Sequence, residues 1–259
     1  MTGVLPIALA DATKVAQAVL QSGKEYVCVI RLHKRMPEDR VKSVLEEFQG
    51  EIYQRPPIRS SVKRRLRTRT IYYLNFLEVQ EKNALFRVGC QSGTYIRKLC
   101  FDIGEILGCG ANMRELRRTR AGPFTEDKGM VTLYDVLDAT SRWRETGEEK
   151  HIKGIIHPME KALELLPKII IRGSAVAAIC HGAYVTAPGI LSLEKGIRRG
   201  DLIAVFTQKG EAVALAHATA SSDIMLKSNR GFMAEPIRVL MDRNTYPKMW
   251  TKSAIRTSD

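Results

Sequence analysis

The residues best suited to chemistry in this sequence are basic, and the densest group spans residues 55–69. This basic segment contains seven basic residues and no acidic residue. Arginine guanidinium groups bind phosphate oxygens in a bidentate manner, and the pair Pro56 and Pro57 stiffens the start of the segment. The composition indicates capture of an RNA or DNA backbone, with Lys63, Arg64 and Arg65 as contacts. A solvated loop without a partner would have the same composition.

A second arginine-rich stretch, RELRRTR, covers residues 114–120 and is followed by a Gly-Pro turn at residues 122–123. We predict that Arg117, Arg118 and Arg120 contact phosphates together with the basic segment. Alone, this stretch would be weak evidence for nucleic-acid binding.

Two further motifs combine an aromatic residue with a charged one. GTYIR at residues 93–97 places Arg97 at the start of a predicted helix, and KEY at residues 24–26 places Tyr26 at the start of a predicted strand. Each motif has a plain structural interpretation, since a tyrosine at such a position usually packs in the core.

The order of these motifs resembles the TruB family of pseudouridine synthases, in its dyskerin-like branch of archaea and eukaryotes. The similarity extends through a C-terminal region that resembles the PUA domain of this branch, and it covers nearly the whole chain. The matching segments are TGVLP (2–6), KEY (24–26), QRPP (54–57), GTYIR (93–97), LRRTRAGPF (116–124), SAVAAICHGA (174–183), Pro188-Gly189, Gly200-Asp201 and YPKMW (246–250).

The resemblance implies isomerisation of uridine in RNA, either at position 55 of tRNA or at rRNA sites chosen by an H/ACA guide RNA. It implies no cofactor and no metal. The implied partners are tRNA, or guide RNA with its rRNA target, and the small proteins of the H/ACA ribonucleoprotein, with no membrane. The implied location is cytoplasmic, or nucleolar if the source is eukaryotic.

The resemblance also assigns roles to residues. Tyr26 would pack on the flipped base and assist its proton transfer, Arg97 would pair with the catalytic aspartate, and Tyr95 and Leu116 would line the pocket. In the PUA-like region, a single-stranded 3′ ACA would approach two turns, although their glycines could simply close β-turns. The residues of these turns are His181, Gly182, Ala183, Pro188 and Gly189.

The family aspartate lies in a loop of the form GTLDPxxTG, and residues 1–3 match only the end of that loop. We therefore expect the aspartate upstream of Met1, in a chain shortened by an internal start in the gene model, a split gene or a deliberate cut. Asp11 and Asp102 are alternative carboxylates, but both fall on predicted helices. The chain alone is predicted to be inactive, and a noncatalytic RNA-binding scaffold is the alternative function. A basic ribosome-associated or DNA-binding protein would explain the charge but not the ordered motifs.

The elements that position these motifs follow from periodicity and turn residues. Helices are predicted at 7–21, 37–49 and 95–108, a strand at 24–34, and a hairpin of strands 70–79 and 84–90. A helical stretch at 158–166 precedes short strands at 168–172, 184–188, 201–207 and 212–218, which is typical of a small barrel.

The fold class is therefore predicted as α+β. We predict a mixed-sheet catalytic domain at 1–166, incomplete at its N-terminus, a PUA domain at 167–243 and an extension at 244–259, loosely ordered at its end.

Composition agrees with a nucleic-acid partner. The net charge is +13, divided as +7 in residues 1–150 and +6 in residues 151–259, so the excess is not confined to one tail. A polyanion is favoured, nucleic acid first and a membrane surface second, while an indifferent basic surface stays possible. No apolar run is long enough for a membrane helix, the start lacks the order of a signal peptide, and the chain is expected to be soluble and cytosolic. The five widely spaced cysteines predict buried thiols rather than a zinc or redox site.

Overall fold

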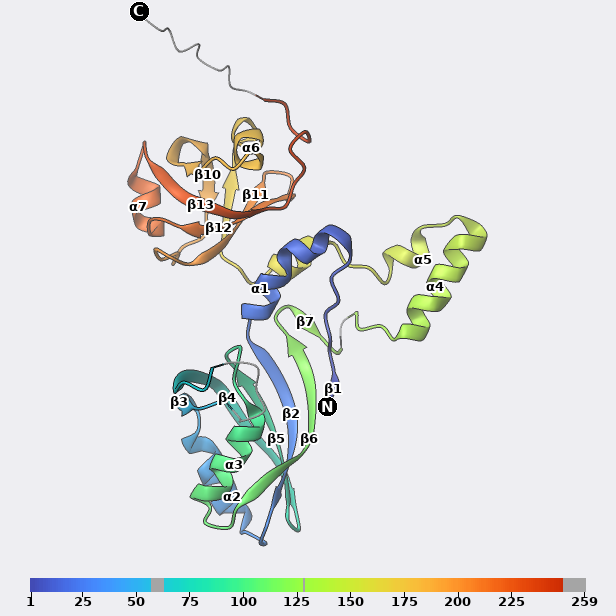
Figure 1. Cartoon of the computed structure of the whole chain (residues 1–259), viewed down its shortest axis with the longest axis vertical. Coiled ribbons are helices and arrows are strands. Elements are labelled where there is room, and N and C mark those ends of the chain that lie inside the picture. The colour runs from blue at the N-terminus through green and yellow to red at the C-terminus, as the bar shows by residue number, and fades with distance from the viewer. Residues whose placement is uncertain (57–62, 128, 249–259) are drawn as a thin grey trace, which may run out of the picture. The chain divides into compact units, whose positions relative to one another are not determined.

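The computed structural model describes residues 1–56, 63–127 and 129–248 of the chain (Figure 1). The described chain forms two compact units, each with its own sheet. Unit 1 contains residues 1–7 and 19–157, and unit 2 contains residues 8–18 together with the chain from Pro158 onward. Within the predicted C-terminal extension, residues 249–259 lie outside the described residues.

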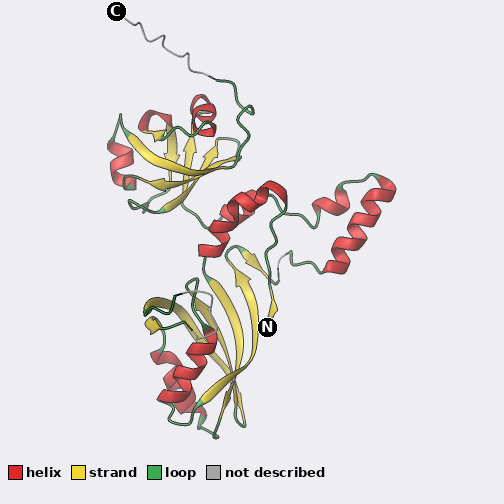
Figure 2. Cartoon of the chain, viewed as in Figure 1, coloured by secondary structure: helices red, strands yellow, loops and turns green. Residues whose placement is uncertain are grey.

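Unit 1 is built on a seven-stranded mixed sheet (Figure 2). The central strands run in the order β1-β6-β2-β5-β4-β3, and β7 pairs with β6. Only the β1–β6 pair is parallel. The strands are β1 (Thr2–Gly3), β2 (Lys24–Leu32), β3 (Gly50–Gln54), β4 (Arg67–Gln80), β5 (Asn83–Cys90), β6 (Ala111–Ala121) and β7 (Phe124–Thr125).

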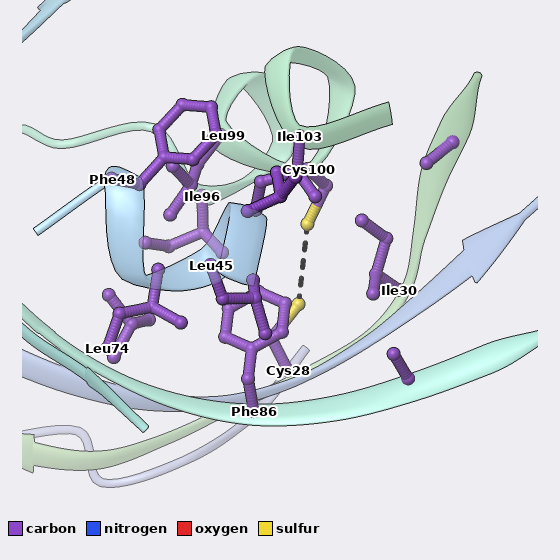
Figure 3. Packing of buried hydrophobic residues seen from close by; sticks show 14 of the residues in the cluster. Cys28, Ile30, Leu45, Phe48, Leu74, Phe86, Ile96, Leu99, Cys100 and Ile103 are labelled. Carbon is purple, nitrogen blue, oxygen red and sulfur yellow. Dashed lines mark hydrogen bonds between the residues drawn. The ribbon is translucent and has the colours of Figure 1, made fainter. Parts of the chain in front are cut away.

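Two helices cover one face of this sheet, α2 (Glu38–Glu47) and α3 (Ile96–Ile106). Alternate residues of the strands, such as Cys28, Ile30 and Phe86, point toward the helices and form one core with them. Figure 3 shows these side chains facing Leu45 of α2 and Leu99 of α3. The core therefore fixes α3, and with it the motif at residues 93–97, against β2 and β6.

Cysteines contribute to this core as small apolar residues. The Sγ atoms of Cys28 and Cys100 lie 3.5 Å apart (Figure 3). All five cysteines are free and buried, which confirms the prediction of buried thiols. Burial raises the pKa of Cys90 to about 11, so this thiol stays protonated at neutral pH.

Helices α4 (Leu133–Thr146) and α5 (Lys150–Lys153) pack mainly on each other. A capping box starts α4: the Asp135 amide donates to the Thr132 hydroxyl, and the Asp135 carboxylate accepts from the Thr132 amide. Gly147, in the left-handed region, ends the helix.

Unit 2 contains a six-stranded sheet in the order β10-β8-β11-β12-β13-β9. Its apolar residues enclose a separate core, which α6 (Gly173–Cys180) helps to close. The other elements are η1 (Ala10–Val15), η2 (Met159–Leu163), β8 (Lys168–Ile171), β9 (Val185–Thr186), η3 (Ala187–Gly189), β10 (Ile190–Leu193), β11 (Leu202–Thr207), β12 (Ala212–Ala218), α7 (Ser222–Lys227) and β13 (Phe232–Val239).

Most predicted elements are confirmed, with shifted ends. The helix predicted at 7–21 begins at Ala10, as η1 followed by α1 (Ala16–Gln21), because residues 4–9 form an extended connection. The stretch at 158–166 contains only the short 3₁₀ helix η2. The predicted α+β fold, with a mixed sheet followed by a second sheet of short strands, is confirmed. No helix within the described part of the chain is both long enough and apolar enough to cross a bilayer.

Candidate functional site

Sheet order in unit 1 joins three of the sequence motifs. Strand β6 lies between β1 and β2, with Gly3 opposite Arg118 on one side and Tyr26 opposite Arg118 on the other. The segments 2–6, 24–26 and 116–124 are far apart in sequence but become neighbours at one end of the sheet.

Arg118 connects these neighbours. Its Nε donates to the Val4 carbonyl at 2.6 Å, and its positive charge acts on the Tyr26 phenol, which lies opposite it in the register. The Val4 amide donates back to the Arg118 carbonyl at 2.7 Å. Gly3 permits this approach, because its φ is +101° and a Cβ there would lie 2.1 Å from the Arg118 carbonyl oxygen.

Tyr26 is held from its own strand as well. The Nζ of Lys24 donates to the carbonyls of Val19, Leu20 and Ser22 at 2.6–2.8 Å, which anchors the start of β2 to the end of α1. Burial raises the pKa of the Tyr26 phenol, and Arg118 opposes part of that rise. Tyr26 therefore presents a neutral hydroxyl at physiological pH.

Helix α3 begins beside this end of the sheet, since β5 ends at Cys90 opposite Lys24. Tyr95 is the N-cap residue of α3, and Arg97 is exposed in its first turn. Leu116 lies opposite Cys28 in β6 and is buried in the same core against which Tyr26 packs. Tyr26 and Leu116 thus share the helix-covered face of the sheet, and Tyr95 and Arg97 lie at the start of α3; we call these four residues the β2–α3 site.

Gln54 is a contributor to this site that the sequence motifs did not single out as functional. Its buried side chain bonds the backbone of Tyr95 in both directions. The signal in the sequence was its place at the start of the QRPP segment (54–57), two residues before the Pro pair.

The carboxylates proposed as alternatives lie elsewhere. Asp102 pairs with Lys98 on α3 at 2.5 Å, and Asp11 pairs with Lys14 in unit 2 at 3.1 Å. Glu25 is next to Tyr26 but belongs to the other set of alternating β2 residues, and it accepts hydrogen bonds from Tyr73 and Thr119. The described residues contain no group of three or more side chains suited to hold a metal ion.

The arginine-rich stretch lies in strand β6, so its side chains alternate between the faces of the sheet. Besides the contacts of Arg118, Arg117 donates to Glu126 at 2.7 Å and Arg120 donates to the Tyr73 hydroxyl at 3.2 Å. These three guanidinium groups therefore already have protein partners.

Lys63, Arg64 and Arg65 of the basic segment are exposed, and residues 57–62 of that segment lie outside the described residues. The Nε of Arg64 donates to the Pro56 carbonyl at 3.3 Å. Lys63, Arg64 and Arg65 thus face solvent to a greater extent than Arg118 and Arg120 of β6, which are half-buried.

Unit 2 has a hollow of about 850 Å³ at the end of α6. His181 and Gly182 line it, together with Lys14, Arg243 and Asn244. Gly182 has a φ of +89° and ends the helix, so its first role is to turn the chain. Ala183, Pro188 and Gly189 are not among its lining residues, and the Pro188 carbonyl accepts from Arg172 at 3.1 Å.

Comparisons with known families cover almost the whole chain. Residues 1–96 match the TruB family pseudouridylate synthase (N terminal domain), and residues 97–164 match the tRNA pseudouridylate synthase B C-terminal domain. Residues 167–240 match the PUA domain.

Individual relatives agree with these family matches. The chain is 56% identical over 252 residues to a probable tRNA pseudouridine synthase B of Methanosarcina barkeri, covering 97% of this chain and 74% of the relative. The corresponding protein of Methanopyrus kandleri is 56% identical over 250 residues, covering 96% of this chain and 74% of the relative.

A crystal structure of a Cbf5-Nop10-Gar1 complex contains a chain with 53% identity and a TM-score of 0.92, covering 95% of this chain and 75% of that chain. A structure of an H/ACA RNP bound to a substrate RNA containing 2′-deoxyuridine contains a chain with 50% identity and a TM-score of 0.88. The match covers 96% of this chain and 75% of that chain. With its motifs adjacent at one sheet end and its domains matched in order, this chain belongs to the TruB family of pseudouridine synthases.

Proposed function

We propose that the β2–α3 site receives a uridine flipped out of an RNA strand for conversion to pseudouridine. The observation that carries this proposal is the adjacency of Tyr26, Arg118 and Val4 at the sheet end where α3 begins. The names of the relatives support a tRNA substrate, and the similar H/ACA RNP, which is bound to a substrate RNA, supports a guide-selected one.

The residues have complementary tasks in this reaction. Tyr26 offers a ring to the base and a neutral hydroxyl that can donate a proton. Arg97 is exposed and takes part in none of the ion pairs found among the described residues, so its guanidinium is available to pair with a carboxylate. The isomerisation of the family requires no redox or metal cofactor.

We also propose that the 259-residue chain alone forms no pseudouridine. Its sequence contains no GTLDP loop, and both Asp11 and Asp102 are engaged with lysines. A site that positions a base without an attacking carboxylate leaves the bond-breaking step uncatalysed.

The test compares this chain with an extended protein, meaning this chain preceded by an upstream segment that carries the aspartate loop. Both are incubated with tRNA and with guide-plus-target RNA, and pseudouridine is measured by mass spectrometry. We expect product only with the extended protein. Product from the 259-residue chain would show that the nucleophile is misassigned, and Asp11→Asn and Asp102→Asn would identify it.

Within the extended protein, Arg97→Ala should reduce activity by about 100-fold or more, while RNA affinity changes far less, because the partner of Arg97 is the carboxylate and not a phosphate. Arg114→Ala, an arginine of the same unit outside the site, is the matched control. Equal losses of affinity and activity in Arg97→Ala would contradict this role.

A second candidate function, RNA binding without catalysis, is favoured by the hollow of unit 2. Lys14 and Arg243 provide positive charge there, and His181 and Asn244 provide hydrogen-bonding groups for a single-stranded 3′ ACA. The partners would be an H/ACA guide RNA and small proteins such as those named in the neighbouring complex.

Titration of guide RNAs with intact and mutated ACA ends tests this function. We expect the mutated end to weaken binding to the chain, and Arg243→Ala to remove the difference between the two RNAs. Equal affinity of the parent chain for both RNAs would overturn the assignment.

A further inference from the structure

The buried side chain of Gln54 lies where the basic segment meets the β2–α3 site. Gln54 is the last residue of β3 and is only 2% exposed. Its Oε1 accepts from the Tyr95 amide at 3.0 Å, and its Nε2 donates to the Tyr95 carbonyl at 3.3 Å. Both polar atoms of this buried side-chain amide thus form hydrogen bonds with Tyr95, so neither is left unsatisfied.

This pairing acts on the residue at which helix α3 begins. Tyr95 is the N-cap of α3, and no side-chain hydrogen bond caps the helix there. The preceding turn is fixed separately: the Thr70 amide donates to the Gln91 side chain at 3.2 Å, and the Thr94 hydroxyl donates to the Gln91 carbonyl at 2.7 Å. Gln54 therefore fixes the Tyr95 backbone directly from β3. The Lys98 and Leu99 amides donate to the same Tyr95 carbonyl at 3.0 Å, so Gln54 also helps to fix the first turn that carries Arg97.

Gln54 also directly precedes the basic segment in the chain. Arg55 follows it and is exposed, Pro56 is buried, and Arg67 lies opposite Gln54 at the other end of the segment. Because Gln54 bonds the Tyr95 backbone, a displacement of this end of β3 would move that backbone with it.

We propose that Gln54 is a positioning residue for uridine isomerisation, which holds Tyr95 and Arg97 in place without contacting the RNA. This role rests on the proposed function of the β2–α3 site. It predicts that loss of the two-way pairing lowers the rate of product formation and leaves RNA affinity nearly unchanged.

The decisive variant is Gln54→Glu in the extended protein, because it keeps the shape of the side chain. An ionised carboxylate can accept from the Tyr95 amide but cannot donate to the Tyr95 carbonyl, whereas a protonated carboxyl can do both. The charged side chains nearest in sequence, in register or at the turn before Tyr95 are Arg55, Arg67, Arg69 and Arg97, whose guanidinium groups stay charged throughout the range tested. A difference in pH dependence between Gln54→Glu and the parent in this range therefore reports on the introduced carboxyl.

Single-turnover rates and RNA affinities are measured between pH 5.5 and pH 8 for the parent, Gln54→Glu, Gln54→Ala and the control Gln80→Glu. Gln80 is an exposed glutamine at the end of β4. At pH 8 we expect both Gln54 variants to lose about tenfold to 100-fold in rate, with affinities within about twofold of the parent. As the pH falls, Gln54→Glu should recover relative to the parent, while Gln54→Ala should not.

Hydrogen exchange gives a second measurement on the 259-residue chain, without catalysis. The Tyr95 amide should exchange faster in Gln54→Ala and not in the control Gln80→Glu. Parent rates in both Gln54 variants, or a loss in Gln54→Glu that does not depend on pH, would overturn the proposal. A parent protein that forms no pseudouridine would instead refute the proposed function on which it rests.

Discussion

At the scale of single residues, the site depends on polar side chains that bond backbone rather than one another. Arg118 bonds the Val4 carbonyl, Lys24 bonds the end of α1, and Gln54 bonds Tyr95. Each of these side chains is partly or fully buried, so each donor gains strength from the low local dielectric. The residues that would meet RNA are therefore positioned by a second set of residues behind them.

Glu25 provides a residue-scale prediction about pH. Burial by itself would raise its pKa, but hydrogen bonds from Thr119 and Tyr73, with the charges of Arg87 and Arg120, lower it overall. The ionised form thus stabilises the fold above the ordinary glutamate pKa, and this contribution is lost as the pH falls through the lowered value.

Glu25→Gln should reduce the free energy of unfolding at pH 7 by about 1 kcal/mol, because an amide offers one acceptor oxygen instead of two. Denaturant unfolding at pH 7 and near pH 3 checks this, and the deficit should shrink at the lower pH. The exposed Glu51→Gln is the control, and a deficit that is the same at both pH values would contradict the assignment.

At the scale of elements, close contact between α3 and β6 fixes the helix that carries Arg97. Gly104 faces the start of β6, and a Cβ there would lie 2.2 Å from the Ala111 amide nitrogen. Because the obstacle is backbone, neither element can yield without moving the other.

Gly104→Ala should therefore lower the free energy of unfolding by about 1–3 kcal/mol, despite the better helix propensity of alanine. Urea denaturation measures the change, and Glu105→Ala on the exposed side of the same turn is the control. An unchanged or more stable Gly104→Ala protein would show that the helix does not approach β6 this closely.

Helix α4 offers an element-scale prediction with a local readout. Its N-terminus depends on the reciprocal pairing of Thr132 and Asp135, and most of its surface is exposed. Thr132→Ala should destabilise the first turn by about 1 kcal/mol, seen as faster amide exchange at residues 133–136. Ser141→Ala, an exposed position of the same helix, should not accelerate exchange there, and equal effects of both variants would argue against the cap.

At the scale of the whole molecule, positive charge in both units predicts salt-dependent RNA binding. The structure distinguishes the two arginine-rich stretches: Lys63, Arg64 and Arg65 are exposed, whereas Arg118 and Arg120 are half-buried and bonded within the protein, and Arg117 pairs with Glu126. The first group is therefore the better candidate for phosphate contacts that release counterions.

Changing Lys63, Arg64 and Arg65 together to alanine should reduce the slope of log affinity against log salt by about 2, since each phosphate contact contributes about 0.7–0.9. Lys34, Lys42 and Lys82 are exposed lysines of the same unit, and replacing them controls for net charge. Filter binding between 50 and 300 mM salt, about the range over which such contacts are screened, gives the slopes. Equal slopes for both triple variants would exclude the basic segment as an RNA contact.

Local patterns in the sequence determined much of this protein. The alternation in residues 24–32, the hairpin of β4 and β5 and the helices α2 and α3 follow from side-chain periodicity and turn residues, which act over a few neighbours. The ordered motifs likewise identified the family before any contact was visible. Strands β3, β6, β10 and β13 did not stand out, because charged or irregular sequences form strands only when neighbours supply the pairing.

Only the tertiary structure decided which of these residues act together. The order β1-β6-β2 brings Gly3 and Tyr26 to opposite sides of Arg118, a juxtaposition of residues more than 90 positions away from Arg118 in the chain. It also gave Arg118 a hydrogen bond to the Val4 carbonyl, and gave Gln54 two hydrogen bonds to Tyr95 that its residue type alone could not indicate. The physical reason is that strand register and burial are set by the whole core, so the partner of a polar side chain is fixed only once the chain has folded.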